Sequence, residues 1–247
     1  MQVILPGDPL PLPESTTSLR LGPGLHLDPP STVLPVRAGL FITTPTTPTT
    51  AYLTTPTPGG RYTPAPHDAI IATVLTRAGD LEHTYYILSL PNAAVPTATL
   101  PASAIARHAS RRAKPSLEKG TTVYARIVAA PASSSSSHIV ELACFDEATG
   151  KDAGFGELKG GMLADISLSL ARRLLLPKTE SVLDLLGARV GFQIAIGRNG
   201  RIWVDAEDCA TTAAVLRAIA ETEYMSPDKM RKRVDKILKT LPQRPSQ

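Results

Sequence analysis

The stretch FQIAIGRNGRIWVDA, from Phe192 to Ala206, decides the C-terminal fold of this chain. Two short apolar runs, Phe192–Ile196 and Ile202–Val204, flank the four residues Gly197-Arg198-Asn199-Gly200. β-Branched residues around a Gly- and Asn-rich turn predict a β-hairpin, because Gly and Asn tolerate the positive φ angles that such turns require.

The same four turn residues fit the G-x-x-G loop with which KH domains clamp a nucleic-acid backbone. A tight turn with no further role is the simpler interpretation of a match this short. The segments before and after the hairpin therefore have to distinguish a clamp from an ordinary turn.

The composition of the chain favours a soluble intracellular protein. Neither Cys144 nor Cys209 has a partner at metal-ligand or redox spacing, so we expect a reducing environment and two thiols in the core. The N-terminus lacks the features of a signal peptide, and no apolar run approaches the roughly 18 residues needed to cross a bilayer. The net charge of +4 is compatible with a nucleic-acid partner.

Residues 1–60 predict a small β-rich domain, because short apolar runs alternate with Gly- and Pro-rich turns. A domain of this size buries little apolar area alone, so we expect it to lean on a neighbour. Thr43–Gly60 is low-complexity Thr/Pro sequence and predicts a loop, with Ala51–Leu53 as a candidate edge strand. The other predicted strands are Val3–Leu5, Leu19–Leu21, Leu25–Leu27 and Val33–Ile42.

Residues 61–147 carry five apolar runs separated by turn signals. Five short strands with a long third connection are typical of an OB-type Greek-key barrel. Of the adjacent Tyr85 and Tyr86, one should face the core and the other solvent, where it can stack a base; core packing of both is the simpler interpretation. The runs are Ala69–Thr76, Thr84–Leu90, Val95–Leu100, Val123–Ala129 and Ile139–Phe145.

The long connection of this barrel, Ile105–Gly120, carries five basic or potentially basic side chains within eight residues, 107–114, and those eight residues include no acid. OB-type domains present such electropositive loops to nucleic acid, although an ordinary solvated loop is an equal alternative. The residues predicted to contact RNA are Arg77, Arg107, His108, Arg111, Arg112 and Lys114.

Residues 148–247 switch to a helical period. Apolar residues from Leu163 to Leu174 recur at three and four positions and predict a helix that Pro177 ends. Ser181–Leu186 predicts a second helix, and after the hairpin Glu207–Tyr224 predicts a third. Ser226-Pro227 predicts the start of a fourth, with a cap at the serine and proline in the first turn.

The fourth predicted helix is strongly basic on its outer side. A solvated helix face is the better interpretation, with a nuclear-localisation or RNA-binding patch as the alternative. Its basic residues are Lys229, Arg231, Lys232, Arg233 and Lys236.

The sequence predicts no catalytic residue, metal site or cofactor. A hydrolytic or phosphorolytic centre needs clustered carboxylates, a metal constellation or an activated nucleophile. The acids are scattered at strand ends and helix starts, where capping explains them. The five histidines show no metal-ligand spacing.

Three stretches together resemble the cap subunits of the RNA exosome. They are Val3–Asp8 (VILPGD), Leu21–Leu25 (LGPGL) and Asn199–Val204 (NGRIWV). Arg61–Pro64 and Ala171–Leu175 also fit the family, and the branch indicated is that of ribosomal-RNA-processing protein 40. The resemblance covers nearly the whole chain, apart from the Thr/Pro insert and a serine run at residues 133–137.

This resemblance implies a multidomain architecture and a non-catalytic role. The three parts are a small N-terminal β domain (1–60), a five-stranded S1-like OB-fold barrel (61–147) and a C-terminal α+β KH domain (148–247). The implied partners are RNase-PH-like ring subunits, other cap subunits, RNA and an associated nuclease. The implied location is the nucleus and nucleolus and also the cytoplasm.

The family pattern also bears on the turn. It implies that the G-x-N-G turn packs between the barrel and the KH unit instead of clamping RNA, which moves the expected RNA contact to the barrel loops. A free-standing S1/KH RNA-binding regulator, which reads RNA with this turn, is the alternative. The residues concerned are Gly197, Arg198, Asn199, Gly200 and Trp203.

Overall fold

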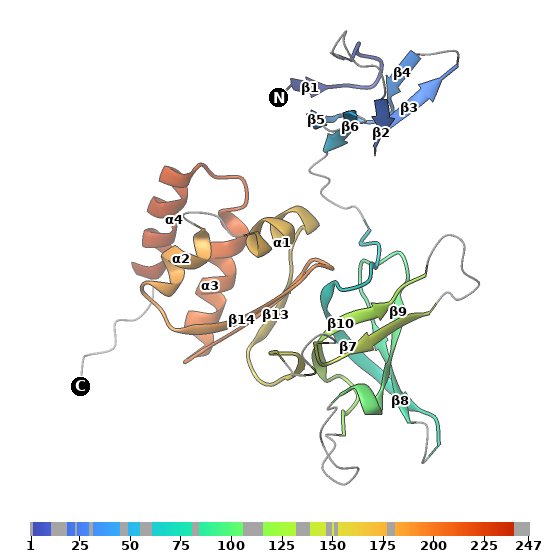
Figure 1. Cartoon of the computed structure of the whole chain (residues 1–247). Helices are drawn as coiled ribbons and strands as arrows, with labels where there is room; N and C mark the ends of the chain where they lie inside the picture. Colours follow the sequence, from blue (N-terminus) through green and yellow to red (C-terminus); the bar gives the residue numbers. More distant parts are fainter. Residues whose placement is uncertain are drawn as a thin grey trace. The chain divides into compact units, whose positions relative to one another are not determined.

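The chain forms two compact units, one within Met1–Thr57 and the other within Pro58–Gln247 (Figure 1). The structure is a computed structural model. It describes residues 2–10, 19–22, 24–29, 32–44, 49–54, 61–80, 84–105, 116–131, 139–146, 150, 153–176 and 181–239.

The first unit is built from strands, as the sequence predicts. Within its described residues, one sheet has the strand order β1, β5, β6, β2, and β3 pairs with β4 in a separate hairpin. Ile4, Phe41, Ala51 and Leu53 form its small buried core. The strands are β1 (Gln2–Ile4), β2 (Leu19–Leu21), β3 (Leu25–Asp28), β4 (Thr32–Pro35), β5 (Gly39–Thr44) and β6 (Thr49–Thr54).

Two predictions for this unit are wrong in detail. The single run Val33–Ile42 is two strands, because the chain leaves β4 at Pro35 and enters a different sheet at Gly39. Ala51–Leu53 is not an edge strand, because β6 lies between β5 and β2. The side chains of Ala51 and Leu53 are both buried on one face of the sheet. The alternation of apolar residues therefore determines the strand here, despite the Thr/Pro-rich composition around them.

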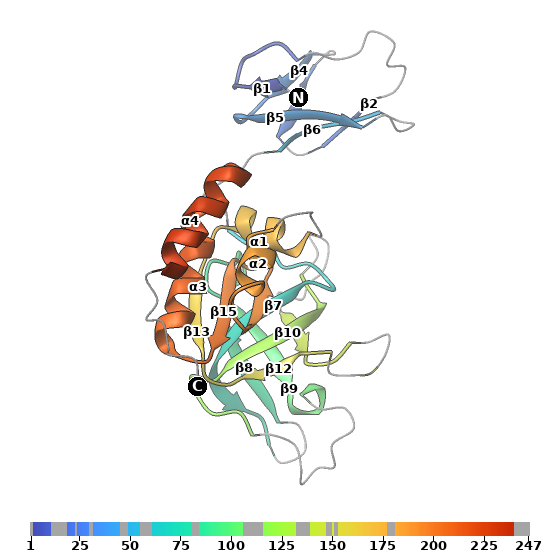
Figure 2. The same cartoon turned by 90° about the vertical axis from the view of Figure 1, so that its left-hand side faces the viewer.

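The second unit begins with the predicted barrel, which five strands close in the order β7, β8, β9, β11, β10 within the part of the chain that the structure describes. Burial along β10 alternates, with Val123, Ala125 and Ile127 inside. A further strand, β12 (Gly156–Leu158), pairs with β10 (Figure 2). The barrel elements are β7 (Ala69–Ala78), β8 (Tyr85–Ser89), β9 (Thr97–Pro101), the 3₁₀ turn η1 (Ala102–Ala104), β10 (Thr122–Ala129) and β11 (Val140–Ala143).

The adjacent tyrosines of the barrel alternate, so the interpretation that both pack in the core is wrong. Tyr86 is 2 % exposed and lies in the core, whereas its neighbour Tyr85 is 38 % exposed. Cys144 is buried in the same core. The prediction for the other thiol is wrong: Cys209 is exposed, because it follows the capping residue Asp208 on the solvent side of the first turn of α3.

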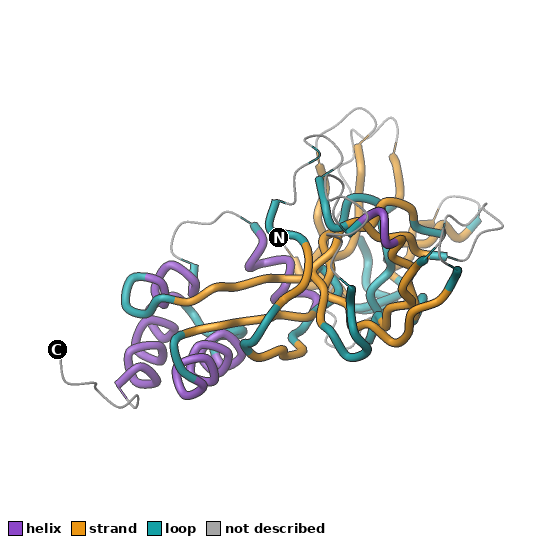
Figure 3. Tube along the Cα trace, turned by 90° about the horizontal axis from the view of Figure 1, so that it is seen from below, coloured by secondary structure: helices purple, strands orange, loops and turns teal. Residues whose placement is uncertain are grey.

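The second unit continues as an α+β KH domain. Its described strands have the order β13, β15, β14, and the helices, purple in Figure 3, lie beside these strands and pack on one face of the β14–β15 hairpin. The elements are β13 (Met162–Asp165), α1 (Leu168–Leu175), α2 (Val182–Gly187), β14 (Phe192–Gly197), β15 (Arg201–Ala206), α3 (Cys209–Glu221) and α4 (Pro227–Lys239). None of these helices is both long and apolar enough to cross a membrane.

The start of the first helix differs from the prediction. The helix begins at Leu168, where the Ser167 side chain accepts a hydrogen bond from the Leu170 N–H. Leu163 instead lies in β13, opposite Trp203 of β15. An apolar side chain at this position fits a helical and a strand pattern equally, and pairing with the hairpin makes the segment a strand.

Glu221 joins the last two helices. Its carboxylate accepts hydrogen bonds from Arg233 of α4 at 2.5 Å and from Arg217, one turn earlier in α3, at 2.8 Å. These two bonds hold the pKa of Glu221 at about 2. A carboxyl group with a depressed folded pKa stabilises the fold above its unfolded pKa of about 4.3 and loses that contribution as pH falls through the folded pKa.

We therefore expect Glu221→Gln to lower the melting temperature at pH 7, with the difference from the parent chain shrinking between about pH 4 and pH 2. Thermal unfolding followed by circular dichroism from pH 2 to pH 8 measures this difference. Glu118→Gln, at an exposed position of the barrel, is the matched control. A difference that persists unchanged at pH 2 would contradict the role of the Glu221 charge.

Candidate nucleic-acid interface and the G-x-N-G turn

The hairpin β14–β15 is apolar on both faces. Ile196, Ile202 and Val204 point into the core beneath the helices. On the opposite face, Ala195 and Trp203 pack against Ile71 of the barrel strand β7. Because side chains alternate along a strand, one face of this short hairpin packs in the KH core and the other face packs against the barrel.

The edge of β7 explains why the hairpin meets the barrel at its turn. Among the described strands, β8 pairs with β7 only from Thr73 onward. The backbone N–H and C=O groups of successive residues in a strand point to opposite sides. Those of Asp68 and Val74 point toward β10, so those of Ala69 and Ile71 point to the other side, where β8 does not reach. Unpaired buried backbone groups are costly, so this edge needs a partner.

The turn supplies that partner. The Arg198 N–H donates to the Ala69 carbonyl oxygen at 2.8 Å. The Asn199 side chain accepts from the Ile71 N–H at 3.2 Å and donates to the Ile71 carbonyl oxygen at 2.8 Å. Asn199 is 0 % exposed, and its amide reproduces the donor and acceptor pair that a neighbouring strand would present.

Both glycines of the turn are required by close approach. A Cβ at Gly197 would lie 2.8 Å from the Ile71 nitrogen, inside van der Waals contact. Gly200 has φ +77°, and a Cβ there would lie 2.8 Å from the Ile166 carbonyl oxygen. Gly197 therefore lets the turn approach the barrel edge, and Gly200 lets it approach the segment before α1.

Arg198 adds an ion pair to the same contact. Its guanidinium lies 2.5 Å from Asp68, whose other oxygen accepts a hydrogen bond from the Tyr62 hydroxyl at 2.7 Å. Burial, together with this hydrogen bond, raises the pKa of Tyr62, and Asp68 raises the pKa of Arg198. The phenol and the guanidinium thus both remain donors at neutral pH.

Further polar contacts flank the turn. Arg201 donates to the Thr73 hydroxyl at 3.1 Å and to Asp165 at 3.2 Å. The Trp203 indole N–H donates to the Gly160 carbonyl oxygen at 2.9 Å, and the ring is 6 % exposed. The turn and the residues around it are therefore engaged with the barrel and with the KH sheet.

The residues predicted to contact RNA lie elsewhere. Arg77 is exposed on β7, and its guanidinium lies 3.5 Å from the Thr84 hydroxyl, next to the exposed Tyr85. Five others lie outside the described residues, namely Arg107, His108, Arg111, Arg112 and Lys114. In the part that the structure describes, no cluster of three or more His, Cys, Asp or Glu side chains is placed to hold a metal ion.

Sequence reasoning missed the barrel side of the contact, which includes Tyr62, Asp68 and Ile71. Asp68 carried a weak signal, because it is a lone carboxylate directly before an apolar strand. Ile71 carried none, because it contributes its backbone, and every residue type has the same backbone groups.

An S1-like barrel joined to a KH domain through a shared hairpin defines the class of S1–KH proteins, built from two folds that recur in RNA recognition. Family models match each part in turn. Residues 19–52 match the exosome complex exonuclease Rrp40 N-terminal domain, residues 62–156 match the S1 domain of exosome complex component RRP40, and residues 161–209 match a KH domain.

Curated relatives identify the family. Exosome complex component RRP40 of Saccharomyces cerevisiae is 36 % identical over 223 residues, which cover 88 % of this chain and 87 % of the relative. The Schizosaccharomyces pombe protein of the same name is 38 % identical over 182 residues, covering 73 % and 71 %. The chain therefore belongs to the RRP40 family of exosome complex components.

A solved structure shares the fold. The crystal structure of a putative exosome complex RNA-binding protein aligns with a TM-score of 0.55 at 20 % sequence identity, covering 72 % of this chain and 98 % of that one.

We expect Asn199→Ala to lower the free energy of unfolding by about 3 kcal/mol, because two buried backbone groups of Ile71 lose their partners. Urea unfolding measures the loss. Gln193→Ala, at an exposed position of the same hairpin, is the control and should change little. Unchanged stability of the Asn199 variant, together with weaker RNA binding, would instead favour a turn that clamps RNA.

Proposed function

We propose that this chain is a non-catalytic, RNA-binding cap subunit of the RNA exosome. In this role it stabilises a ring of RNase-PH-like subunits and guides RNA into the central channel for 3′–5′ processing and degradation by an associated nuclease. Its partners are the ring subunits, the other cap subunits and RNA. It works in the nucleus and nucleolus and also in the cytoplasm.

The observation that carries this proposal is the extent of the similarity to the RRP40 protein of Saccharomyces cerevisiae, which at 223 residues is longer than either compact unit and so spans both. The S1 and KH folds support the RNA-binding part. The scattered acids and the lack of a nucleophile motif in the sequence support a role in guiding RNA and not in cleaving it.

The geometry of the turn supports an assignment of RNA contact to the barrel loops. A KH clamp works by close approach of the G-x-x-G backbone to the nucleic acid. In this chain the Arg198 N–H and the Asn199 amide already bond the edge of β7. The basic connection with Arg107, Arg111 and Arg112 is the stronger candidate surface.

The proposal is tested first by affinity purification of the tagged chain from its source, followed by mass spectrometry. We expect a stoichiometric set of RNase-PH-like subunits together with other cap subunits. Recovery of the chain as a monomer, or only with unrelated proteins, would contradict the proposal and favour a free-standing RNA-binding regulator.

The RNA-contact surface is tested in the same particle. Replacing Arg107, Arg111 and Arg112 with Ala should weaken RNA crosslinking to this subunit and leave assembly intact, because phosphate contacts contribute affinity without holding the fold. Arg61, Lys159 and Arg172, all exposed, replaced together by Ala, remove the same charge elsewhere and should leave crosslinking unchanged. Equal crosslinking of RNA to the two variants would exclude the basic loop as the RNA-contact surface.

A further inference from the structure

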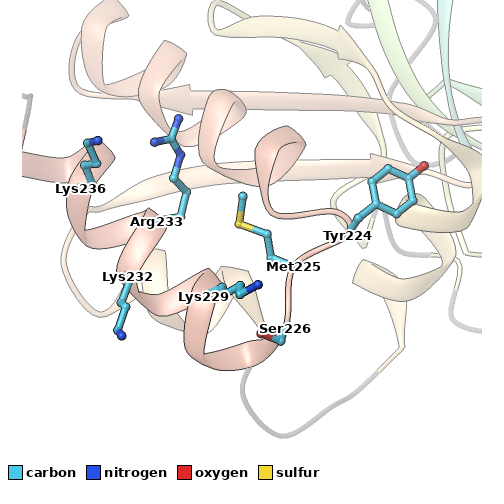
Figure 4. A pocket seen from close by; sticks show the side chains of 7 residues that line it. All are labelled: Tyr224, Met225, Ser226, Lys229, Lys232, Arg233 and Lys236. Carbon is cyan, nitrogen blue, oxygen red and sulfur yellow. The ribbon is translucent and has the colours of Figure 1, made fainter.

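A groove lies between the turn after α3 and the exposed side of α4. It has a volume of about 680 Å³ (Figure 4). Its lining combines a short apolar floor with cationic side chains on the helix. The lining residues are Tyr224, Met225, Ser226, Lys229, Lys232, Arg233 and Lys236.

The lysines form a row along the groove. Lys229, Lys232 and Lys236 are three and four residues apart, so they share one helix face. The rise of the helix spaces their Cα atoms about 4.5 Å and 6 Å along the axis. Within the described residues, none of the three takes part in a salt bridge.

Two acids near this row, Glu221 and Asp235, are engaged with arginines, whereas Asp228, one residue before Lys229, is exposed and forms no salt bridge within the described residues. Glu221 pairs with Arg233 and with Arg217, and Asp235 of α4 pairs with Arg189 at 2.7 Å. The guanidinium group of arginine matches a carboxylate, so these pairs neutralise Glu221 and Asp235, and the three lysines remain without a salt bridge.

Tyr224 stands at one end of the groove. It is 76 % exposed, an unusual exposure for a large aromatic side chain, and its neighbour Met225 is 37 % exposed. Glu223, which accepts a hydrogen bond from Ser167, also hydrogen-bonds the Tyr224 hydroxyl. The polar end of the ring thus has a protein partner, while most of its apolar surface remains open.

We propose that this groove binds a short stretch of single-stranded RNA, with phosphates against Lys229, Lys232 and Lys236 and a base stacked on Tyr224. An electropositive track with an exposed aromatic ring is the combination that single-strand binders use. This inference rests on the proposed function, because it adds a second RNA contact, outside the barrel, to the same subunit.

The chemistry of the groove favours RNA over an acidic peptide. The groove cations without a salt bridge are lysines, which bind phosphate as point charges, whereas the arginine that best fits a carboxylate is already paired. The groove backbone on the α4 side is helical and offers no strand edge to an extended peptide. A base also supplies the π face that an exposed tyrosine ring can stack.

The test uses the full-length chain and a fluorescent oligouridine, with affinity measured by anisotropy over a range of salt concentrations. Replacing all three lysines with Ala should flatten the slope of log affinity against log salt by about 2, at about 0.7 per lost phosphate contact. Tyr224→Ala should weaken binding about tenfold, and Tyr224→Phe should retain it.

Two controls separate the groove from general charge and from folding. The triple variant at Arg61, Lys159 and Arg172 removes the same charge and should keep the parent salt slope. Far-ultraviolet circular dichroism and the melting temperature of each groove variant should match the parent, because the four replaced side chains are exposed. Parent-like affinity of both the lysine and Tyr224→Ala variants would overturn the inference.

A polyglutamate peptide serves as competitor in the same assay. If it displaces the oligouridine from the groove at equal charge concentration, and Tyr224→Ala has no effect, the groove is a site for an acidic protein and the inference is overturned. The groove variants can bind RNA like the parent while the Arg107, Arg111 and Arg112 variant still shows weaker RNA crosslinking and ring subunits are still captured. That result overturns the groove inference and leaves the proposed function standing. Failure to capture ring subunits contradicts the proposed function whatever the groove binds.

Discussion

The second unit depends on the hydrogen-bonded pairing of the Asn199 side chain with the backbone of Ile71. Strand β7 runs past the end of its neighbour β8, which leaves backbone groups of the barrel without a strand partner. An asparagine amide carries one donor and one acceptor side, so it can complete the edge as a strand would. The bonds form in a place closed to water, where leaving those groups unpaired is most costly.

The other contacts between barrel and KH domain extend this pairing. Arg198 reaches Asp68 and Tyr62 on one side of the turn, and Arg201 reaches Thr73 on the other. Trp203 and Ala195 fill the space against Ile71. A turn whose sequence matches a nucleic-acid clamp thereby joins two domains, and the RNA contacts that we propose lie on other surfaces.

The distribution of charge supports one of these proposed surfaces. Most arginines of the described KH domain form ion pairs, for example with Asp68, Asp165, Glu221 and Asp235. The groove lysines of α4 form no salt bridge within the described residues and lie beside an exposed tyrosine. The sequence favours a solvated face for this helix, with an RNA-binding patch as the alternative, and the turn after α3 adds Tyr224 and Met225 beside it.

The sequence by itself determined the elements whose signals are local. Apolar runs between turn signals predicted the five barrel strands, the G-R-N-G turn predicted the hairpin, and Ser181 and Ser226-Pro227 marked the starts of α2 and α4. The resemblance to exosome cap subunits also rested on short motifs. These features were predictable because backbone preference and capping act over a few residues.

Only the tertiary structure decided how these elements meet. It placed β6 inside its sheet, made residues 162–165 a strand and left Cys209 exposed. It also brought Asn199 to Ile71, a partner 128 residues away in the chain. The physical reason is that the backbone groups at a strand edge pair with whichever segment the fold brings there. Every residue type has the same backbone groups, so the sequence does not identify the partner.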